Sequence, residues 1–258
     1  MNTQSSHWYD DEANARHTII GKNGKERNTT IADARKNNWY PSVSGVIGVL
    51  DKGDLSNWKH RQITSAAFLT QPQAGEFPEA YHARIMDAAF KQVNDAADLG
   101  TRIHAAIENH CTGKPYDGAL KPYVDGAQQW LDNNDVRLCR HEMRLVNRVE
   151  GFAGTTDAEF VTPTMRGILD WKSRKTKPGN PVQPYDTQVL QIAAYGKTYF
   201  NQPFGGVNVY VSTTEIINGC ARVEATWYTE AECVAAWDAF KHAAALWRYL
   251  KKYDPRKP

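Results

Sequence analysis

The stretch that decides the fold is Gly151–Lys175, GFAGTTDAEFVTPTMRGILDWKSRK. Two strand-like runs flank the turn-forming residues Thr162–Met165, and this order predicts a β-hairpin. The midpoint between Asp157 and Asp170 falls inside the turn, so the two carboxylates are expected directly opposite each other. Opposed side chains of an antiparallel pair share one face, with Cβ atoms about 5 Å apart.

This pair of carboxylates points to a metal site. Two carboxylates held so close repel each other unless a cation or a proton lies between them, and a divalent metal with oxygen ligands suits the gap. Lys172 follows Asp170 by two residues, which puts it on the same face of the strand. An ammonium beside metal-bound carboxylates can polarise a water for attack on a phosphodiester. On spacing alone, a hairpin with exposed charges and a Lys–Asp pair is the alternative.

Outward from the hairpin, the hydrophobic pattern is helical on the N-terminal side and mixed on the C-terminal side. Helices are predicted at residues 41–50, 55–69, 78–111, 121–134, 187–200 and 230–252, and strands at 136–149, 152–161, 166–171, 207–213 and 221–228. Gly100 is expected to mark a kink or a junction in the longest helix. Helices followed by β-β-β-α-β-β-α predict an α/β (α+β) fold with a mixed central sheet flanked by helices.

The chain length of 258 residues fits one large domain with a sizeable core. Within one compact domain we expect a polar N-terminal arm at 1–38, a helical annex at 39–134 that carries His104, and a core at 135–258. The first residues hold Asp10, Asp11 and Glu12 and lack an apolar run, so we expect neither a signal peptide nor a transit peptide. No apolar run reaches the length of a membrane span, and the expected location is the cytoplasm of a bacterium or a phage-infected cell, without membrane contact.

The composition excludes two classes of protein. Eight Trp, twelve Tyr and eight Phe exclude a disordered chain, and a net charge of +2 excludes a wholly basic nucleic-acid coat. The charge is nevertheless partitioned: residues 165–177 carry +4 and residues 241–258 carry +5, which leaves −7 for the rest. Such patches suit a local grip on backbone phosphates and predict salt-sensitive binding to DNA.

Five motifs then follow one another in an order that resembles the PD-(D/E)XK nuclease superfamily, and within it the RecB-type exonucleases. They are Gly100-Thr101-Arg102-Ile103-His104, Glu142, Gly154-Thr155-Thr156-Asp157, Asp170-Trp171-Lys172, and the helix segment Gln191 to Tyr195. The segment Pro41–Lys59 is similar to the N-terminal part of phage-encoded exonucleases of this group and of the mitochondrial genome-maintenance exonuclease. The resemblance covers roughly residues 30 to 200.

The resemblance implies a PD-(D/E)XK core with a helical annex and a metal-dependent DNase activity. In this family's pattern, Asp157 and Asp170 bind Mg²⁺ or Mn²⁺ together with the backbone carbonyl of Trp171. Lys172 orients the attacking water, and His104 approaches the metal from the annex. Hydrolysis of DNA as an exonuclease, in phage or bacterial recombination or processing, is the implied function, with a single-strand annealing protein as an implied partner.

Further residues receive roles from the same resemblance. Gln191 and Tyr195 line the site and hold DNA or the catalytic Lys, while Glu142 matches an acidic position whose role varies. The DNA-binding residues expected from charge and aromaticity are Arg166, Arg174, Lys175, Lys177 and Trp58. The four cysteines lack a C-x-x-C pair and are too sparse for the iron–sulfur cluster of some relatives, so no cluster is expected.

Each assignment has an alternative. His104 and Glu108 are four residues apart and could form a helix-surface pair, Tyr195 fits the buried stripe of its helix, and Gln188 could supply the functional amide in place of Gln191. Two alternatives to the exonuclease also stand: a structure- or site-specific endonuclease on the same core, and a nucleic-acid-binding protein whose catalytic site has decayed.

Overall fold

A computed structural model describes residues 7–50 and 53–257 of the chain. The helices are α1 (Ile31–Asn37), α2 (Val43–Ile47), α3 (Gly53–Leu69), α4 (Pro78–Cys111), α5 (Lys121–Asn133), α6 (Gln188–Tyr199) and α7 (Glu230–Lys251), with a 3-10 turn η1 (Gly118–Leu120). The strands are β1 (Trp8–Tyr9), β2 (Thr18–Ile20), β3 (Glu26–Asn28), β4 (Tyr40–Pro41), β5 (Arg137–Asn147), β6 (Phe152–Val161), β7 (Arg166–Arg174), β8 (Gly205–Ile217) and β9 (Cys220–Tyr228).

The central sheet has five strands in the order β5-β6-β7-β8-β9. β7 and β8 are parallel, whereas the other three neighbouring pairs are antiparallel. Parallel strands need a long crossover connection, and α6 lies within that connection. The predicted α+β fold with a mixed sheet flanked by helices is therefore confirmed.

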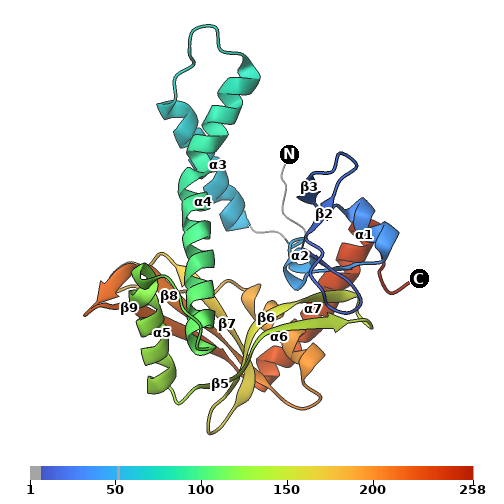
Figure 1. Cartoon of the computed structure of the whole chain (residues 1–258), viewed down its shortest axis with the longest axis vertical. Coiled ribbons are helices and arrows are strands. Elements are labelled where there is room, and N and C mark those ends of the chain that lie inside the picture. Colours follow the sequence, from blue (N-terminus) through green and yellow to red (C-terminus); the bar gives the residue numbers. More distant parts are fainter. Residues whose placement is uncertain (1–6, 51–52, 258) are drawn as a thin grey trace.

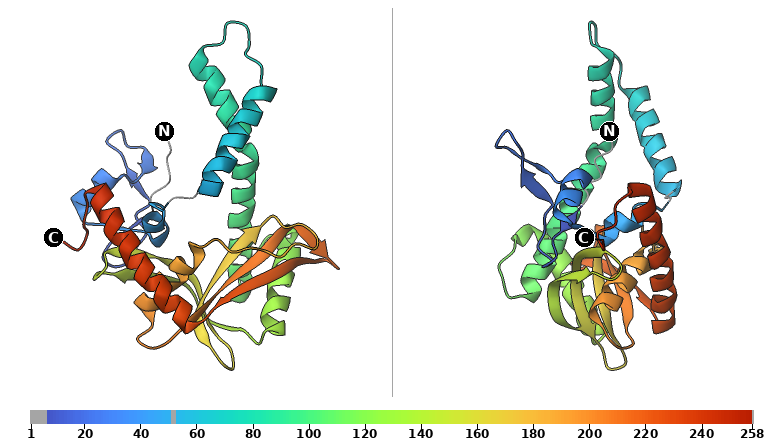
Figure 2. Two further views of the ribbon diagram at one scale, coloured as in Figure 1. Left: turned by 180° about the vertical axis from the view of Figure 1, so that it is seen from behind. Right: turned by 90° about the vertical axis from the view of Figure 1, so that its right-hand side faces the viewer.

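Successive side chains of a strand point to opposite faces of the sheet. Neighbouring apolar residues of its central strands therefore pack against helices on both faces. Ile168 of β7 packs in a cluster with Ile192 of α6 and Phe240 of α7. The next residue, Leu169, belongs to a second cluster with Ile107 of α4 and Val209 of β8. The right-hand view of Figure 2 shows the sheet between α7 on one side and α5 on the other.

Helices α3 and α4 form an arm that projects away from the sheet (Figure 1). At 34 residues, α4 is about 51 Å long, and only its C-terminal half lies on the sheet. The projecting half packs on α3 through a small cluster that contains Ala66, Ile85 and Ala89. Ala96 and Ala97, which lie on α4 between this cluster and Gly100, are exposed.

Gly100 marks a close approach between elements, and α4 continues through it without a break. A Cβ atom at position 100 would lie 2.5 Å from the Oγ of Ser173 on β7. Glycine therefore lets α4 press against the sheet, one turn before His104. The expected kink or junction at Gly100 is absent. Gly100 instead allows a close contact that sets the distance between α4 and the strands.

The N-terminal segment is more structured than its polar composition indicated. Trp8 is only 2% exposed and lies in the same apolar cluster as Trp247 and Tyr253. β1 pairs with β4, and Thr30 caps the N-terminus of α1 in a capping box with Asp33. Aromatic anchors thus hold residues that we expected to form an irregular arm. Within the described residues, none of the helices is long and apolar enough to cross a membrane.

Candidate active site

The site forms where β6 and β7 diverge. The register Ala158↔Leu169 places Asp157 opposite Asp170 when it is continued by one residue, as the midpoint of the turn predicted. Pairing between the two strands stops at Ala158 and Leu169: β6 continues with β5, whereas β7 continues with β8. The two aspartates therefore lie at the fork, just beyond the last backbone pairing between β6 and β7.

Asp157 is held by a main-chain donor and a histidine. Its Oδ2 accepts a hydrogen bond of 2.7 Å from the backbone N–H of Trp171. The same oxygen lies 2.9 Å from Nε2 of His104. Burial alone would raise the pKa of Asp157, but the hydrogen bond and charge of His104, the charge of Lys172 and the Trp171 N–H hold it below its ordinary value. Asp157 is accordingly ionised at neutral pH.

Asp170 is nearly inaccessible, with 2% of its surface exposed. Lys172 Nζ lies 2.7 Å from its Oδ1 and 2.6 Å from its Oδ2, and Asn208 Nδ2 donates to Oδ2 at 2.6 Å. Burial raises the pKa of Asp170 to about 6, because the repulsion from Asp157 acts in the same direction and the charge of Lys172 offsets only part of it. Lys172 itself stays charged: burial lowers its pKa, but the two aspartates outweigh burial and raise it.

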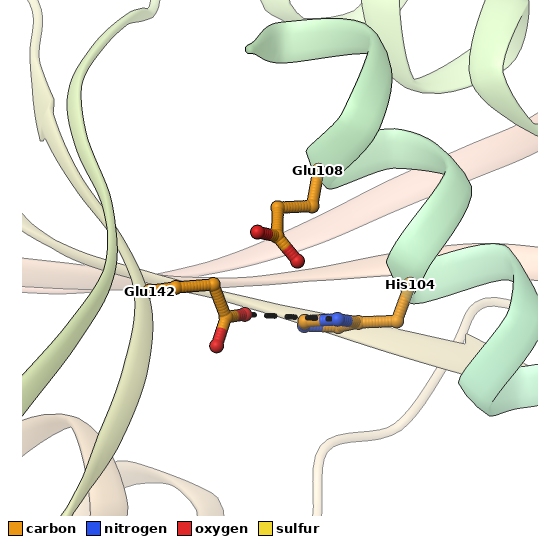
Figure 3. A group of neighbouring side chains, drawn as sticks. All are labelled: His104, Glu108 and Glu142. Carbon is orange, nitrogen blue, oxygen red and sulfur yellow. Dashed lines mark ion pairs between the residues drawn. The ribbon is translucent and has the colours of Figure 1, made fainter. Parts of the chain in front are cut away.

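His104 connects the helical side of the site to the strands. Burial lowers its pKa, but the hydrogen bond and charge of Asp157, with the charges of Glu142 and Asp170, raise the pKa to about 9. Figure 3 shows His104 and Glu108 reaching from α4 toward Glu142 of β5. His104 Nδ1 lies 3.9 Å from Glu142 Oε1, and the potential ligand atoms of these three residues lie within 4.8 Å of one another.

Glu142 reaches this group through an unusual backbone conformation. Its φ of +46° is left-handed, although it sits between Met143 and His141, which pair regularly with β6. Non-glycine residues rarely adopt such angles within a strand. The sequence had given Glu142 no definite role, and it had treated Glu108 as a surface partner of His104. The spacing of four residues between His104 and Glu108 was the available signal that both project from one face of α4.

The donor set of the site fits a divalent cation that prefers hard ligands. Carboxylates and an imidazole converge from three directions: α4, the fork of β6 and β7, and β5. Carboxylate oxygens suit Mg²⁺ and Mn²⁺, and imidazole is a ligand of divalent transition-metal ions. The mutual repulsion of Asp157 and Asp170, which raises the pKa of Asp170, is the electrostatic condition that a bound cation relieves.

Helix α6 supplies the wall of the site. Gln191 Oε1 lies 3.5 Å from Nζ of Lys172, whereas Gln188 accepts hydrogen bonds from the Tyr210 hydroxyl and a backbone N–H of its own loop. Tyr195 is 4% exposed and packs on Gly154, where a Cβ atom would lie 2.6 Å from its hydroxyl oxygen. Gln191 is thus the amide that faces the lysine, and Tyr195 belongs to both the core and the edge of the site.

The Trp171 side chain points away from the carboxylates. Its indole is 7% exposed, belongs to the cluster between the sheet and α5, and meets Trp130 edge-on at 6.3 Å between ring centroids. Its backbone N–H serves Asp157, as described above. Because side chains alternate along β7, the Trp171 side chain packs in the core while its main chain contacts the site.

The basic residues expected to bind DNA divide into two groups. Arg174 lies two residues beyond Lys172 and stacks on Tyr185, with its guanidinium carbon 3.9 Å from the ring centroid. Lys175 and Lys177 follow it and are exposed, and Trp58 on α3 is 38% exposed.

Arg166, in contrast, begins β7, about 13 Å along the strand from Asp170. Its guanidinium is engaged by Glu159 at 3.0 Å and by the ring of Phe200 at 4.8 Å. These contacts hold Arg166 at the N-terminal end of the central strand β7, away from the fork.

Asn208 and Tyr228 were missed by sequence reasoning. Asn208 is fully buried, and Tyr228 donates a hydrogen bond of 2.9 Å to its Oδ1. The available signal was a polar residue inside the otherwise apolar run Val207–Val211. A buried amide in such a strand needs hydrogen-bond partners, and here one of the partners is Asp170.

The solved structures that align with this chain over most of its length include the following two. An alkaline exonuclease (LHK-Exo) from Laribacter hongkongensis aligns with 14% identity and a TM-score of 0.35, and the alignment covers 82% of this chain and 91% of that chain. A crystal structure titled SSO0001 aligns with 15% identity and a TM-score of 0.33, covering 78% and 87%. TM-scores below 0.5 assign neither a family nor an activity to the chain. No protein-family model and no curated protein sequence matches it.

Proposed function

We propose that this protein is a divalent-metal-dependent nuclease that hydrolyses phosphodiester bonds of DNA. The observation that carries the proposal is the fork of β6 and β7, where Asp157, Asp170 and Lys172 meet His104 of α4. A buried carboxylate (Asp170), a partly buried one (Asp157), an ammonium and an imidazole in one place match the equipment of metal-assisted hydrolysis. These residues belong to the motifs whose order and residue types resemble those of the PD-(D/E)XK nucleases.

In this proposal Asp157 and Asp170 hold the metal, Mg²⁺ or Mn²⁺, with His104 and the backbone carbonyl of Trp171 as further ligands. Glu142 and Glu108 lie beside His104 and add negative charge that favours a cation. A bound divalent cation supplies Lewis-acid stabilisation of the phosphate and lowers the pKa of a water.

Lys172 and α6 act on the attacking water and the substrate. Lys172 contacts both oxygens of Asp170, and because an ammonium has three N–H donors, its third N–H is available to orient a water. Gln191, 3.5 Å from the ammonium, gives it an alternative acceptor. Arg174, Lys175 and Lys177 at the end of β7 provide cations for the backbone phosphates.

An exonuclease acting in DNA processing is the finer proposal, and it rests on the resemblance to RecB-type enzymes. The decisive experiment incubates linear DNA labelled at one end at a time, single- and double-stranded, beside a closed circle. Each substrate is tested with Mg²⁺, Mn²⁺ or EDTA. The proposal expects metal-dependent loss of the linear substrates and an intact circle. Cleavage of the circle would favour an endonuclease, and no cleavage of any substrate under any metal would refute the nuclease.

A further inference from the structure

Asn208 is a buried amide whose position on β8 is paired with that of Asp170 on β7. The two residues are register partners in the parallel pair. Asn208 is 0% exposed, and its neighbours along the strand, Val207 and Val209, pack in the apolar cluster on the other face. An amide placed there would cost stability unless its donor and its acceptor were both satisfied.

Both ends of the Asn208 amide have a hydrogen-bond partner, and these partners fix its orientation. Nδ2 of Asn208 donates to Oδ2 of Asp170 at 2.6 Å, and the hydroxyl of Tyr228 donates to Oδ1 of Asn208 at 2.9 Å. An ionised carboxylate can only accept hydrogen bonds, so it requires the NH₂ end of the amide. The phenol hydrogen bond fixes the opposite end. The three side chains therefore form a directed chain of donors that ends on Asp170.

The chain provides Asp170 with a contact that catalysis does not need to disturb. Lys172 touches both oxygens of Asp170, and at least one of these contacts must loosen if the carboxylate is to present an oxygen to a cation. The hydrogen bond from Asn208 can persist throughout. Asp157 has an equivalent fixed donor in the backbone N–H of Trp171. Each aspartate of the pair is thus held by one neutral donor.

We infer that Asn208 is a positioning residue, supported by Tyr228, which holds Asp170 so that one of its oxygens is presented to the metal. The inference rests on the proposed function, because it gives Asn208 a role toward a carboxylate that would ligate the cation. Partners that orient a metal ligand in this way change metal affinity or activity by about 10- to 100-fold when they are removed.

The test measures Mn²⁺ binding by calorimetry and cleavage of linear DNA as a function of Mn²⁺ concentration. The variants are Asn208→Leu, which keeps a similar volume without a donor, Tyr228→Phe, and the double variant. Tyr253→Phe is the matched control, because Tyr253 is also a buried phenol, and its hydroxyl lies 2.8 Å and 3.1 Å from the backbone carbonyl oxygens of Trp39 and Ala34, away from the site. Circular dichroism and thermal unfolding identify the folded variants.

For Asn208→Leu we expect Mn²⁺ affinity to fall about 10- to 100-fold and cleavage to recover at saturating Mn²⁺. A merely structural role would lower the active fraction at every Mn²⁺ concentration. Tyr228→Phe should weaken Mn²⁺ binding by less than Asn208→Leu does and by more than Tyr253→Phe does. Its effect should vanish in the Asn208→Leu background, because the chain is then already broken.

A folded Asn208→Leu variant that binds Mn²⁺ as tightly as wild type would overturn the inference. If that variant does not fold, Tyr228→Phe decides, and Mn²⁺ affinity equal to that of Tyr253→Phe would overturn it. Failure of the proposed function looks different: the wild-type protein itself would then neither bind Mn²⁺ nor cleave DNA.

Discussion

The most informative prediction concerns the proton on His104. In the metal-free protein the pKa of this imidazole is raised to about 9, chiefly by Asp157 working against burial. At pH 7 the protonated form therefore exceeds the neutral form by about 100 to 1. A metal can bind only the neutral imidazole, so a metal that is held by His104, as we propose, must displace this proton at pH 7.

The size of the effect follows from the same pKa. The apparent Mn²⁺ affinity at pH 7 should be about 100-fold weaker than in the range above pH 9, and it should rise roughly tenfold for each pH unit between pH 7 and pH 8.5. Asp170, with a pKa of about 6, is mostly ionised at pH 7 and contributes only a small part of the released proton.

Calorimetry in PIPES, HEPES and Tris at pH 7 measures the number of protons released, because these buffers differ in their ionisation enthalpy. Wild type should release about one proton for each Mn²⁺ bound. His104→Gln should release close to none while it still binds Mn²⁺ through the carboxylates. A Mn²⁺ affinity that does not change between pH 6.5 and pH 8.5, or equal proton release by both proteins, would refute the reasoning.

Without metal, the same pair makes stability depend on pH. A pKa that is raised on folding contributes stability that is fully present below the unfolded value and lost as pH rises through the folded one. The contribution of His104 should therefore be complete below pH 6.5 and disappear as pH approaches 9. Denaturant unfolding in EDTA across this range tests the sign, with His104→Gln as the reference. A wild-type protein that gains stability relative to His104→Gln over this range would contradict it.

Three further predictions concern single substitutions. Lys172→Met should lower the rate constant of cleavage at saturating DNA about 100-fold or more without weakening Mn²⁺ binding, since the ammonium competes with the cation for the carboxylate of the fork. Weakened Mn²⁺ binding would instead make Lys172 a structural support of the metal site. Gly154→Ala should cost about 1–3 kcal/mol in urea unfolding because its Cβ would lie 2.6 Å from the hydroxyl of Tyr195. Gly118→Ala, whose Cβ would meet nothing within 4 Å, is the matched control, and equal losses would contradict the packing argument. Lys175→Ala, on an exposed residue, should weaken DNA binding and reduce its salt dependence by roughly one counterion, and an unchanged salt slope would remove Lys175 from the phosphate contacts.

Local patterns predicted much of the fold. The predicted bounds of α4, Pro78–Cys111, agree with the structure. Both ends are marked in the sequence, because proline is favoured in the first turn of a helix and Gly113 and Pro115 follow its last residue. The hairpin register also followed from local chemistry, because the turn fixes which residues face each other. From that register came the opposition of Asp157 and Asp170 and the placement of Lys172 beside them.

What could not be predicted depends on contacts between distant elements. The burial of Trp8 requires α7, which lies more than 200 residues later in the chain. The left-handed backbone of Glu142 has no sequence signal, since glycine is absent at that position. Asn208 becomes meaningful only once β8 is known to lie beside β7. Sequence motifs identify residues that resemble known catalytic groups, whereas supporting residues emerge from the packing.

The central claim is that the carboxylates at the fork carry metal-dependent cleavage of DNA, and Asp170→Asn tests it most directly. The measurement follows end-labelled DNA with Mn²⁺ and with EDTA, and binding of the same DNA by wild type and variant. We predict cleavage by wild type only with Mn²⁺, and no cleavage by Asp170→Asn, which should still fold and bind DNA. Cleavage by Asp170→Asn at the wild-type rate, or wild-type cleavage that persists in EDTA, would contradict the account.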